Sequence, residues 1–144
     1  RKNKDISVLG SNAKINLIYK KKYILSKFPL KNKNIIKTLP FYNPIIHSSV
    51  CMRKKIFRDY KYDKNFLKAQ DYKLWQILAK NKIQFENLPQ KLITLNKLKP
   101  PTILDIIYEI KVKYRHNSLF RNFVLSINIP IILVKVLINN FFYN

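Results

Sequence analysis

The chain has 144 residues, of which 47% are hydrophobic and 13% aromatic, and this composition excludes a disordered basic tail. It is long enough for one domain with a buried core and too short for two. The formal net charge of +22 comes from 29 Lys and Arg residues against 7 Asp and Glu residues. Such a charge favours a polyanionic partner: nucleic acid, an anionic membrane or a phosphorylated substrate.

Lysine supplies most of this positive charge, because arginine occurs only at positions 1, 53, 58, 115 and 121. The chain is also rich in Ile and Asn, a pattern typical of A/T-rich codon usage, which supplies lysine without selection for a ligand. Arginine is the residue preferred for bidentate recognition of phosphates and bases. We therefore expect no nucleic-acid partner. A small basic nucleic-acid- or membrane-binding protein without enzymatic activity stays open as the alternative.

Two scarce residue types limit the chemistry further. Gly10 is the only glycine, which excludes a P-loop or a complete dinucleotide-binding domain, since both need several glycines around their phosphates. Cys51 is the only cysteine, which leaves no disulfide framework and no zinc-ligand spacing, and favours a reducing, cytosolic setting. The sequence opens with Arg1 rather than Met and without a secretory signal, so we expect a fragment of a longer protein.

The first part of the chain predicts strands and loops. Residues 5–11 predict a short buried strand that ends near the glycine, and the alternation in residues 13–19 predicts a half-buried strand. Residues 20–37 are rich in lysine and predict a loop or a weak helix. Residues 39–57 contain two prolines and predict a loop that leads into a strand near residues 49–53.

Helical spacing of Leu74, Ile77 and Leu78 predicts a helix over residues 69–80. We expect Leu74, Trp75 and Ile77 to lie in its core face. The next stretch, "NKIQFENLP", predicts a strand with Ile83 and Phe85 pointing inward. We expect Pro89 to end this strand, because proline cannot donate to a sheet.

A third helix is predicted after Pro100 and Pro101, with Thr102 as its N-cap. Its apolar stripe consists of Ile103, Ile106, Ile107, Ile110 and Tyr114. Residues 123–143 are apolar and long enough to cross a bilayer, but Lys135 and several Ser and Asn residues make spanning costly. We expect an amphipathic helix in the interface of an anionic membrane, while packing onto the domain stays open.

Four stretches follow one another in an order that carries a resemblance. They are "DISVLGS", "NPIIHSSVCMRKKIF", "YDKNFLKAQDYKLWQILAK" and "FENLPQKL", which lie between residue 5 and residue 95. In this order they resemble the second half of family 2 glycosyltransferases of the GT-A fold, the bacterial type that builds surface polysaccharides. Each stretch alone is a weak signal, and their shared order is more specific.

The resemblance implies an α/β fold in two parts. Residues 1–99 would form the C-terminal, acceptor-side part of a Rossmann-like GT-A catalytic domain, and residues 100–144 a basic and apolar α-helical tail that associates with a membrane. It also implies an inverting transfer from a nucleotide-sugar donor to a glycan or lipid-linked acceptor in cell-surface polysaccharide synthesis. The implied location is the cytoplasm, peripheral at the inner face of the plasma membrane.

Asp71 resembles the catalytic base of this family. An inverting transfer needs one carboxylate to take the proton of the acceptor hydroxyl, and a helix N-terminus favours the ionised form of that carboxylate. The alternative is that Asp71 only stabilises the start of its helix, as acidic residues in a first turn commonly do. The two roles are compatible, because a base must also be held in place.

The resemblance assigns acceptor binding to His47, Ser48, Ser49 and Gln70. Gln70 stands where the family usually has glutamate, and for His47 a purely structural role stays open.

Lys97 and Lys99 lie in the stretch where the family often has arginine and histidine near the diphosphate. They would bind the diphosphate as flexible point charges.

The metal site of the family would lie upstream of Arg1, since no Asp-x-Asp or Asp-Asp pair occurs in the chain. Mg²⁺ and Mn²⁺ bind through carboxylate oxygens and substrate phosphates. We therefore expect a divalent metal only together with the upstream half, and no metal bound by this chain alone. The isolated chain should not catalyse transfer.

Overall fold

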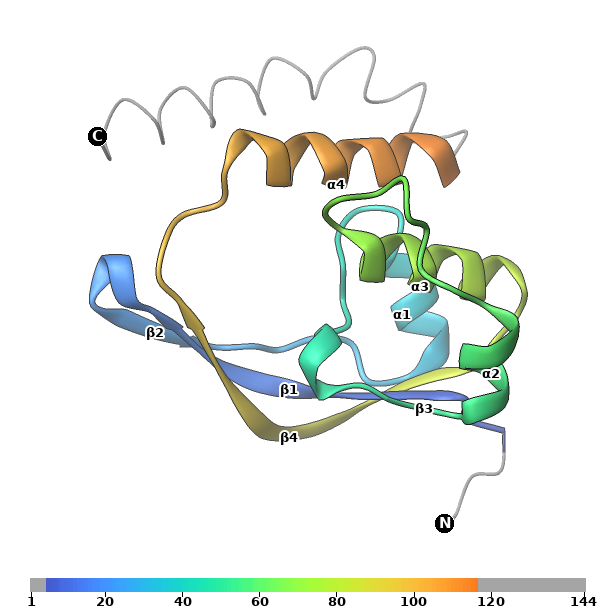
Figure 1. The fold of residues 1–144 in the computed structure, drawn as a ribbon. Coiled ribbons are helices and arrows are strands. Elements are labelled where there is room, and N and C mark those ends of the chain that lie inside the picture. The colour runs from blue at the N-terminus through green and yellow to red at the C-terminus, as the bar shows by residue number, and fades with distance from the viewer. Residues whose placement is uncertain (1–4, 117–144) are drawn as a thin grey trace.

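A mixed four-stranded sheet organises residues 5–116, the part of the chain that this computed structural model describes (Figure 1). The strands are β1 (Val8–Leu17), β2 (Lys22–Leu25), β3 (Cys51–Met52) and β4 (Phe85–Lys97). β1 is central, because all three other strands pair with it. β4 runs parallel to β1 along its whole length, whereas β3 and β2 pair antiparallel with its beginning and its end.

Four α-helices lie between or after the strands in chain order within the described residues. They are α1 (Asn32–Thr38), α2 (Lys54–Asp59), α3 (Gln70–Lys80) and α4 (Ile103–His116), with 3-10 turns η1 (Ile18–Lys20) and η2 (His47–Ser49). In Figure 1, α1 and α3 lie over one face of the sheet, and α4 lies beyond α3 on the same side. The described residues therefore form a mixed α/β fold, which is compatible with a fragment of a Rossmann-like domain.

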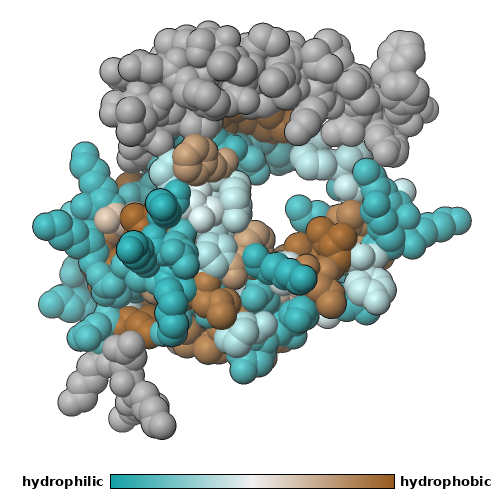
Figure 2. Space-filling view, turned by 180° about the vertical axis from the view of Figure 1, so that it is seen from behind, coloured by the Kyte–Doolittle hydropathy of each residue, from teal (hydrophilic) through white to brown (hydrophobic). Residues whose placement is uncertain are grey.

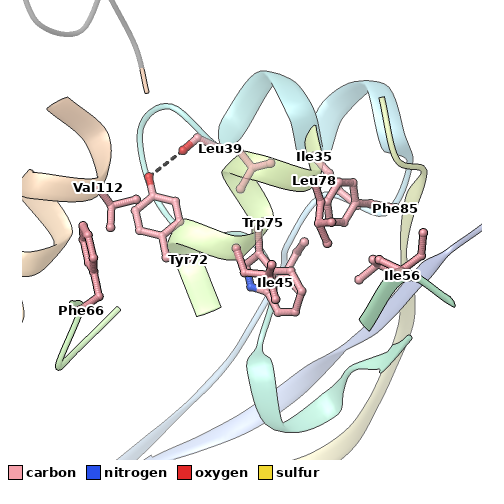
Figure 3. Close-up of a cluster of buried hydrophobic side chains, with 12 residues drawn as sticks. Ile35, Leu39, Ile45, Ile56, Phe66, Tyr72, Trp75, Leu78, Phe85 and Val112 are labelled. Carbon is pink, nitrogen blue, oxygen red and sulfur yellow. Dashed lines mark hydrogen bonds between the residues drawn. The ribbon is translucent and has the colours of Figure 1, made fainter. Parts of the chain in front are cut away.

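The core lies between α3 and the sheet (Figure 3). Trp75 is fully buried and meets the Phe85 ring edge-on, with 6.5 Å between the ring centroids. Leu74 and Leu78 are also buried, so the prediction of a helix with Leu74 and Trp75 in the core is confirmed. Each large apolar side chain buried in this way contributes about 1.5–3 kcal/mol.

The two strands predicted for residues 5–11 and 13–19 form one strand, β1, which continues past Gly10. Close packing, rather than a turn, explains why position 10 is glycine. A Cβ at this position would lie 2.4 Å from Asn87 Oδ1. The predicted strand near residues 49–53 is confirmed by β3.

The prediction that Pro89 ends its strand is wrong, because β4 continues to Lys97. The pairing of β4 with β1 shifts register after Leu88, where Ser11 faces Leu88 but Asn12 faces Lys91. Pro89 therefore lies in a bulge outside the ladder, where its missing N–H removes no hydrogen bond from the sheet.

The prediction of a loop or weak helix for residues 20–37 missed β2, although α1 lies in that range. Every residue of β2 is exposed, so no alternation of buried and exposed positions marks the strand in the sequence. Its apolar members gather on the β1–β2 hairpin at the right of Figure 2. Helix α2 was also missed; it is only six residues long.

Thr102 and Asp105 begin α4 with a reciprocal pair of hydrogen bonds. The Thr102 N–H donates to Asp105 Oδ2 at 2.7 Å, and the Asp105 N–H donates to Thr102 Oγ1 at 3.3 Å. The predicted N-cap is thus confirmed. The predicted stripe is only partly covered: Ile103 and Ile107 are about half exposed, since α4 reaches the core through Val112.

The tail predicted for residues 123–143 lies outside the described residues. Within residues 5–116, no helix is both long and apolar enough to cross a bilayer.

Substituting Gly10→Ala should destabilise the fold by about 2 kcal/mol, because the new methyl group would collide with Asn87 Oδ1. Urea unfolding of both proteins measures the difference. The double variant Gly10→Ala/Asn87→Ala removes the colliding oxygen, so its loss should be smaller than the sum of the two single losses. Strict additivity would contradict the contact.

Acid should weaken the start of α4. Burial raises the pKa of Asp105, but hydrogen bonds from Lys68 and Thr102 outweigh it and lower that pKa from 3.8 to about 2. The depressed pKa stabilises the folded state above about pH 4, and this stabilisation is lost as the pH falls toward about 2. Urea unfolding at several pH values should show wild type losing on the order of 1 kcal/mol more than Asp105→Asn, after allowance for screening. Equal losses would contradict the assignment.

Candidate functional site

Asp71 lies in the first turn of α3 with its side chain half-buried. The Asn43 side-chain amide donates a hydrogen bond to Asp71 Oδ2 at 3.0 Å. The other end of that amide is also used, because Asn43 Oδ1 accepts a hydrogen bond from the Ile45 N–H at 3.2 Å. The orientation of the Asp71 carboxylate is therefore fixed by a loop that is 28 residues away in the sequence.

The helix that carries Asp71 begins in an unusual way. Ala69, its N-cap residue, has φ 55° and ψ 28°, the left-handed conformation, which costs a residue with a side chain about 1–2 kcal/mol. Backbone strain of this kind is concentrated at functional sites. Ala69 offers no side-chain cap, and the hydrogen bond to the Asp71 carboxylate comes from Asn43 rather than from a helix amide. Any helix-stabilising role of Asp71 therefore acts through the dipole alone.

The side chains of His47 and Tyr62 contact each other. His47 Nε2 is 2.9 Å from the Tyr62 hydroxyl, and the two rings meet edge-on. Burial raises the pKa of Tyr62, and the negative charge of Asp71 raises it further. We call Asn43, His47, Tyr62 and Asp71 the Asp71 cluster.

A partly buried ion pair holds the segment just before α3. The Lys73 ammonium contacts the Asp63 carboxylate and lies 4.0 Å from the centroid of the Phe66 ring. Asp63 also accepts a hydrogen bond from the Asn65 N–H at 2.9 Å, which forms a tight turn. The segment between Tyr62 and Asp71 is thus fixed at its turn.

The other residues expected to bind the acceptor are placed differently. Ser49 Oγ donates to the Ile46 carbonyl at 2.8 Å and accepts from the Ser11 N–H at 3.0 Å, so it connects η2 to β1. Ser48 is exposed on the same turn as His47. The exposed Gln70 donates to the Phe66 carbonyl next to Asp71. Acceptor binding by these residues stays a prediction.

Lys97 and Lys99 are exposed at and beyond the end of β4. Asn87, near the start of the same strand, donates to the Pro44 carbonyl beside Asn43. Ten residues of strand separate Lys97 from Asn87, about 30 Å along the chain. The structure thus does not bring Lys97 to the Asp71 cluster, and the diphosphate role of both lysines stays a prediction.

Sequence reasoning missed Asn43 and Tyr62 as members of the site. A signal was present in both: Asn43 precedes Pro44 in a typical turn pair, and Tyr62 opens the stretch that carries the resemblance. Neither signal indicates which distant carboxylate the side chain would meet.

The chemistry of the cluster suits proton transfer rather than metal binding. The Asp71 carboxylate accepts a hydrogen bond from an amide and acts electrostatically on a phenol, whose hydroxyl contacts an imidazole. Mg²⁺ or Mn²⁺ prefers several carboxylate oxygens. Across residues 5–116 no three His, Cys, Asp or Glu side chains come close enough together to hold a metal ion. A divalent metal that binds only together with an upstream half therefore stays a prediction.

Comparison with known proteins gives one informative similarity. The chain is 30% identical over 79 residues to a protein of Haemophilus influenzae described as an uncharacterized glycosyltransferase. The matched region is 54% of this chain and 22% of that relative, so the chain spans about a fifth of the length of the curated relative it matches. No family model and no solved structure matches. The similarity suggests a glycosyltransferase.

Replacing Asp71 with asparagine should lower the Tyr62 pKa, because the negative charge that opposes ionisation of the phenol is removed. An NMR titration with ¹³C-labelled tyrosine resolves the individual rings. Asp59→Asn removes a carboxylate that pairs with Arg58 instead, and should leave the Tyr62 pKa unchanged. The same Tyr62 pKa in wild type and Asp71→Asn would contradict the placement of these two groups.

Proposed function

We propose that this chain is the acceptor-side part of an inverting glycosyltransferase of the family 2 type with a GT-A fold. The enzyme would move a sugar from a nucleotide-sugar donor to a glycan or lipid-linked acceptor in cell-surface polysaccharide synthesis. The observation that carries the proposal is the half-buried Asp71 carboxylate, held by Asn43 at the strained start of α3. The similarity over 79 residues to an uncharacterized glycosyltransferase supports the enzyme class.

The proposed reaction uses Asp71 as a general base. Its carboxylate takes the proton of an acceptor hydroxyl while the hydroxyl oxygen forms a bond to the anomeric carbon of the donor sugar. The bond from that carbon to the nucleoside diphosphate breaks, and the diphosphate leaves with the electron pair. Asn43 keeps the carboxylate oriented, and Tyr62 with His47 forms one wall of the acceptor site.

The donor side of the site would come from outside this chain. A divalent metal, Mg²⁺ or Mn²⁺, would be bound there by an Asp-x-Asp motif and would supply charge stabilisation to the diphosphate. We place the enzyme in the cytoplasm at the inner face of the plasma membrane, where a basic chain of net charge +22 meets anionic lipid.

Transfer should depend on Asp71 in the complete reading frame that contains this chain. Asp71→Asn preserves the shape of the side chain and removes the base, so kcat should fall at least about 100-fold with little change in the KM for the donor. The measurement is release of nucleoside diphosphate from a panel of nucleotide sugars. Glu86→Gln makes the same chemical change at a carboxylate that pairs with Lys31, and should retain activity.

Two results would overturn the proposal. One is full activity of Asp71→Asn, which would exclude the carboxylate as the base. The other is transfer from a nucleotide sugar by the purified 144-residue chain alone, which would mean that the donor site is not supplied from outside.

A further inference from the structure

Two aromatic side chains beside the Asp71 cluster are exposed to solvent. Phe41 is 59% exposed and Tyr42 is 45% exposed, and they directly precede Asn43 in the chain. Together with residues of α1 they line a shallow hollow of about 460 Å³, which we call the aromatic hollow. Its lining consists of Asn34, Lys37, Thr38, Phe41 and Tyr42. Adjacent exposed aromatic rings in a hollow are typical of a binding surface.

The aromatic hollow is attached to the helix that carries Asp71. The Leu39 carbonyl accepts hydrogen bonds from the Tyr72 hydroxyl at 2.6 Å and from the Gln76 amide at 3.3 Å (Figure 3 shows the first). Tyr72 is the residue after Asp71, and Asn43 bonds to Asp71 itself. The segment between Leu39 and Asn43 is therefore held to α3 at both ends.

The backbone of the hollow is also fixed from α1. The N–H groups of Phe41 and Tyr42 both donate to the Thr38 carbonyl, at 2.9 and 3.3 Å. The Thr38 hydroxyl donates to the Asn34 carbonyl at 2.8 Å and can still accept a hydrogen bond. The two rings thus lie on an ordered turn. Binding of a ligand therefore carries no entropic cost for ordering that turn.

We propose that the aromatic hollow binds a sugar ring of the acceptor glycan, an inference that rests on the proposed function. A sugar presents C–H groups on its face, which the negative face of an aromatic ring attracts, and hydroxyl groups around its edge. Asn34 and Lys37 line the same hollow, and their exposed polar ends can bond to those hydroxyls. The hollow is also within the usual size of ligand sites, about 300–1,000 Å³.

The position of the hollow suits an acceptor that extends past the reacting sugar. Consecutive Cα atoms are about 3.8 Å apart, so Tyr42 and Asn43 are neighbours within the span of one sugar ring. The hollow and the Asn43–Asp71 hydrogen bond thus lie on one continuous segment, and the inference assigns the sugar on the hollow to the same acceptor as the reacting sugar. This arrangement would favour oligosaccharide acceptors over single sugars.

Saturation-transfer NMR on the 144-residue chain tests this site without requiring transfer. The probes are maltotriose, cellotriose, chitotriose and lactose. At least one should bind to wild type, and its Kd should rise about tenfold or more in Phe41→Ala and in Tyr42→Ala. Phe41→Leu keeps apolar volume but removes the ring, and should lose binding to a similar extent.

A control variant makes the result specific. Tyr23 is 59% exposed on β2, matching Phe41, and Tyr23→Ala should bind the sugar like wild type. Circular dichroism confirms that each variant is folded.

The outcomes separate this inference from the proposed function. Failure of all four probes to bind, or equal binding by wild type and Phe41→Ala, would overturn the sugar site while leaving the Asp71→Asn transfer assay to judge the enzyme. Full binding by Phe41→Leu would also overturn it, since that result indicates general apolar contact. Ring-dependent binding without any transfer by the complete reading frame would retain the sugar site and reject glycosyl transfer.

Discussion

The hydrogen bonds between α3 and the Leu39–Asn43 segment are the interaction on which the rest of the site depends. The Tyr72 hydroxyl is buried, and burial raises the pKa of Tyr72, so this phenol stays a neutral donor. A buried hydroxyl without a partner costs several kcal/mol, and the Leu39 carbonyl supplies the partner. This hydrogen bond therefore fixes the irregular Leu39–Asn43 segment against helix α3. The carboxylate of Asp71 then meets the Asn43 amide one residue earlier on the same helix.

The sheet holds the same segment from its other side. Asn87 on β4 donates two hydrogen bonds, to the carbonyls of Pro29 and Pro44, which flank α1 and the aromatic hollow. This contact is the reason that β1 carries glycine at position 10, where any side chain would displace the amide. The core, the strained start of α3 and the loop that holds Asp71 are therefore one connected arrangement, fixed by hydrogen bonds and packing.

The sequence predicts the parts of this arrangement whose cause is local. Helix α3 follows from the spacing of its apolar residues, and the Thr102 cap follows from the prolines before it, because both signals lie within a few residues. Strand β2 escapes prediction since all of its residues are exposed, and the continuation of β4 past Pro89 depends on a bulge set by its pairing with β1. Asp71 is found through resemblance, but its partner Asn43 is 28 residues away and only the fold brings them together.

The most direct test of this account is a double-mutant cycle on Asn43 and Asp71, measured as the rate of transfer by the complete reading frame. Asn43 is proposed to act only by orienting the Asp71 carboxylate. The account predicts that Asn43→Ala slows transfer when Asp71 is present and adds no further loss to Asp71→Asn, as expected for residues that act as a unit. Losses that multiply in the double variant would show that the two side chains work independently, and would contradict the site described here.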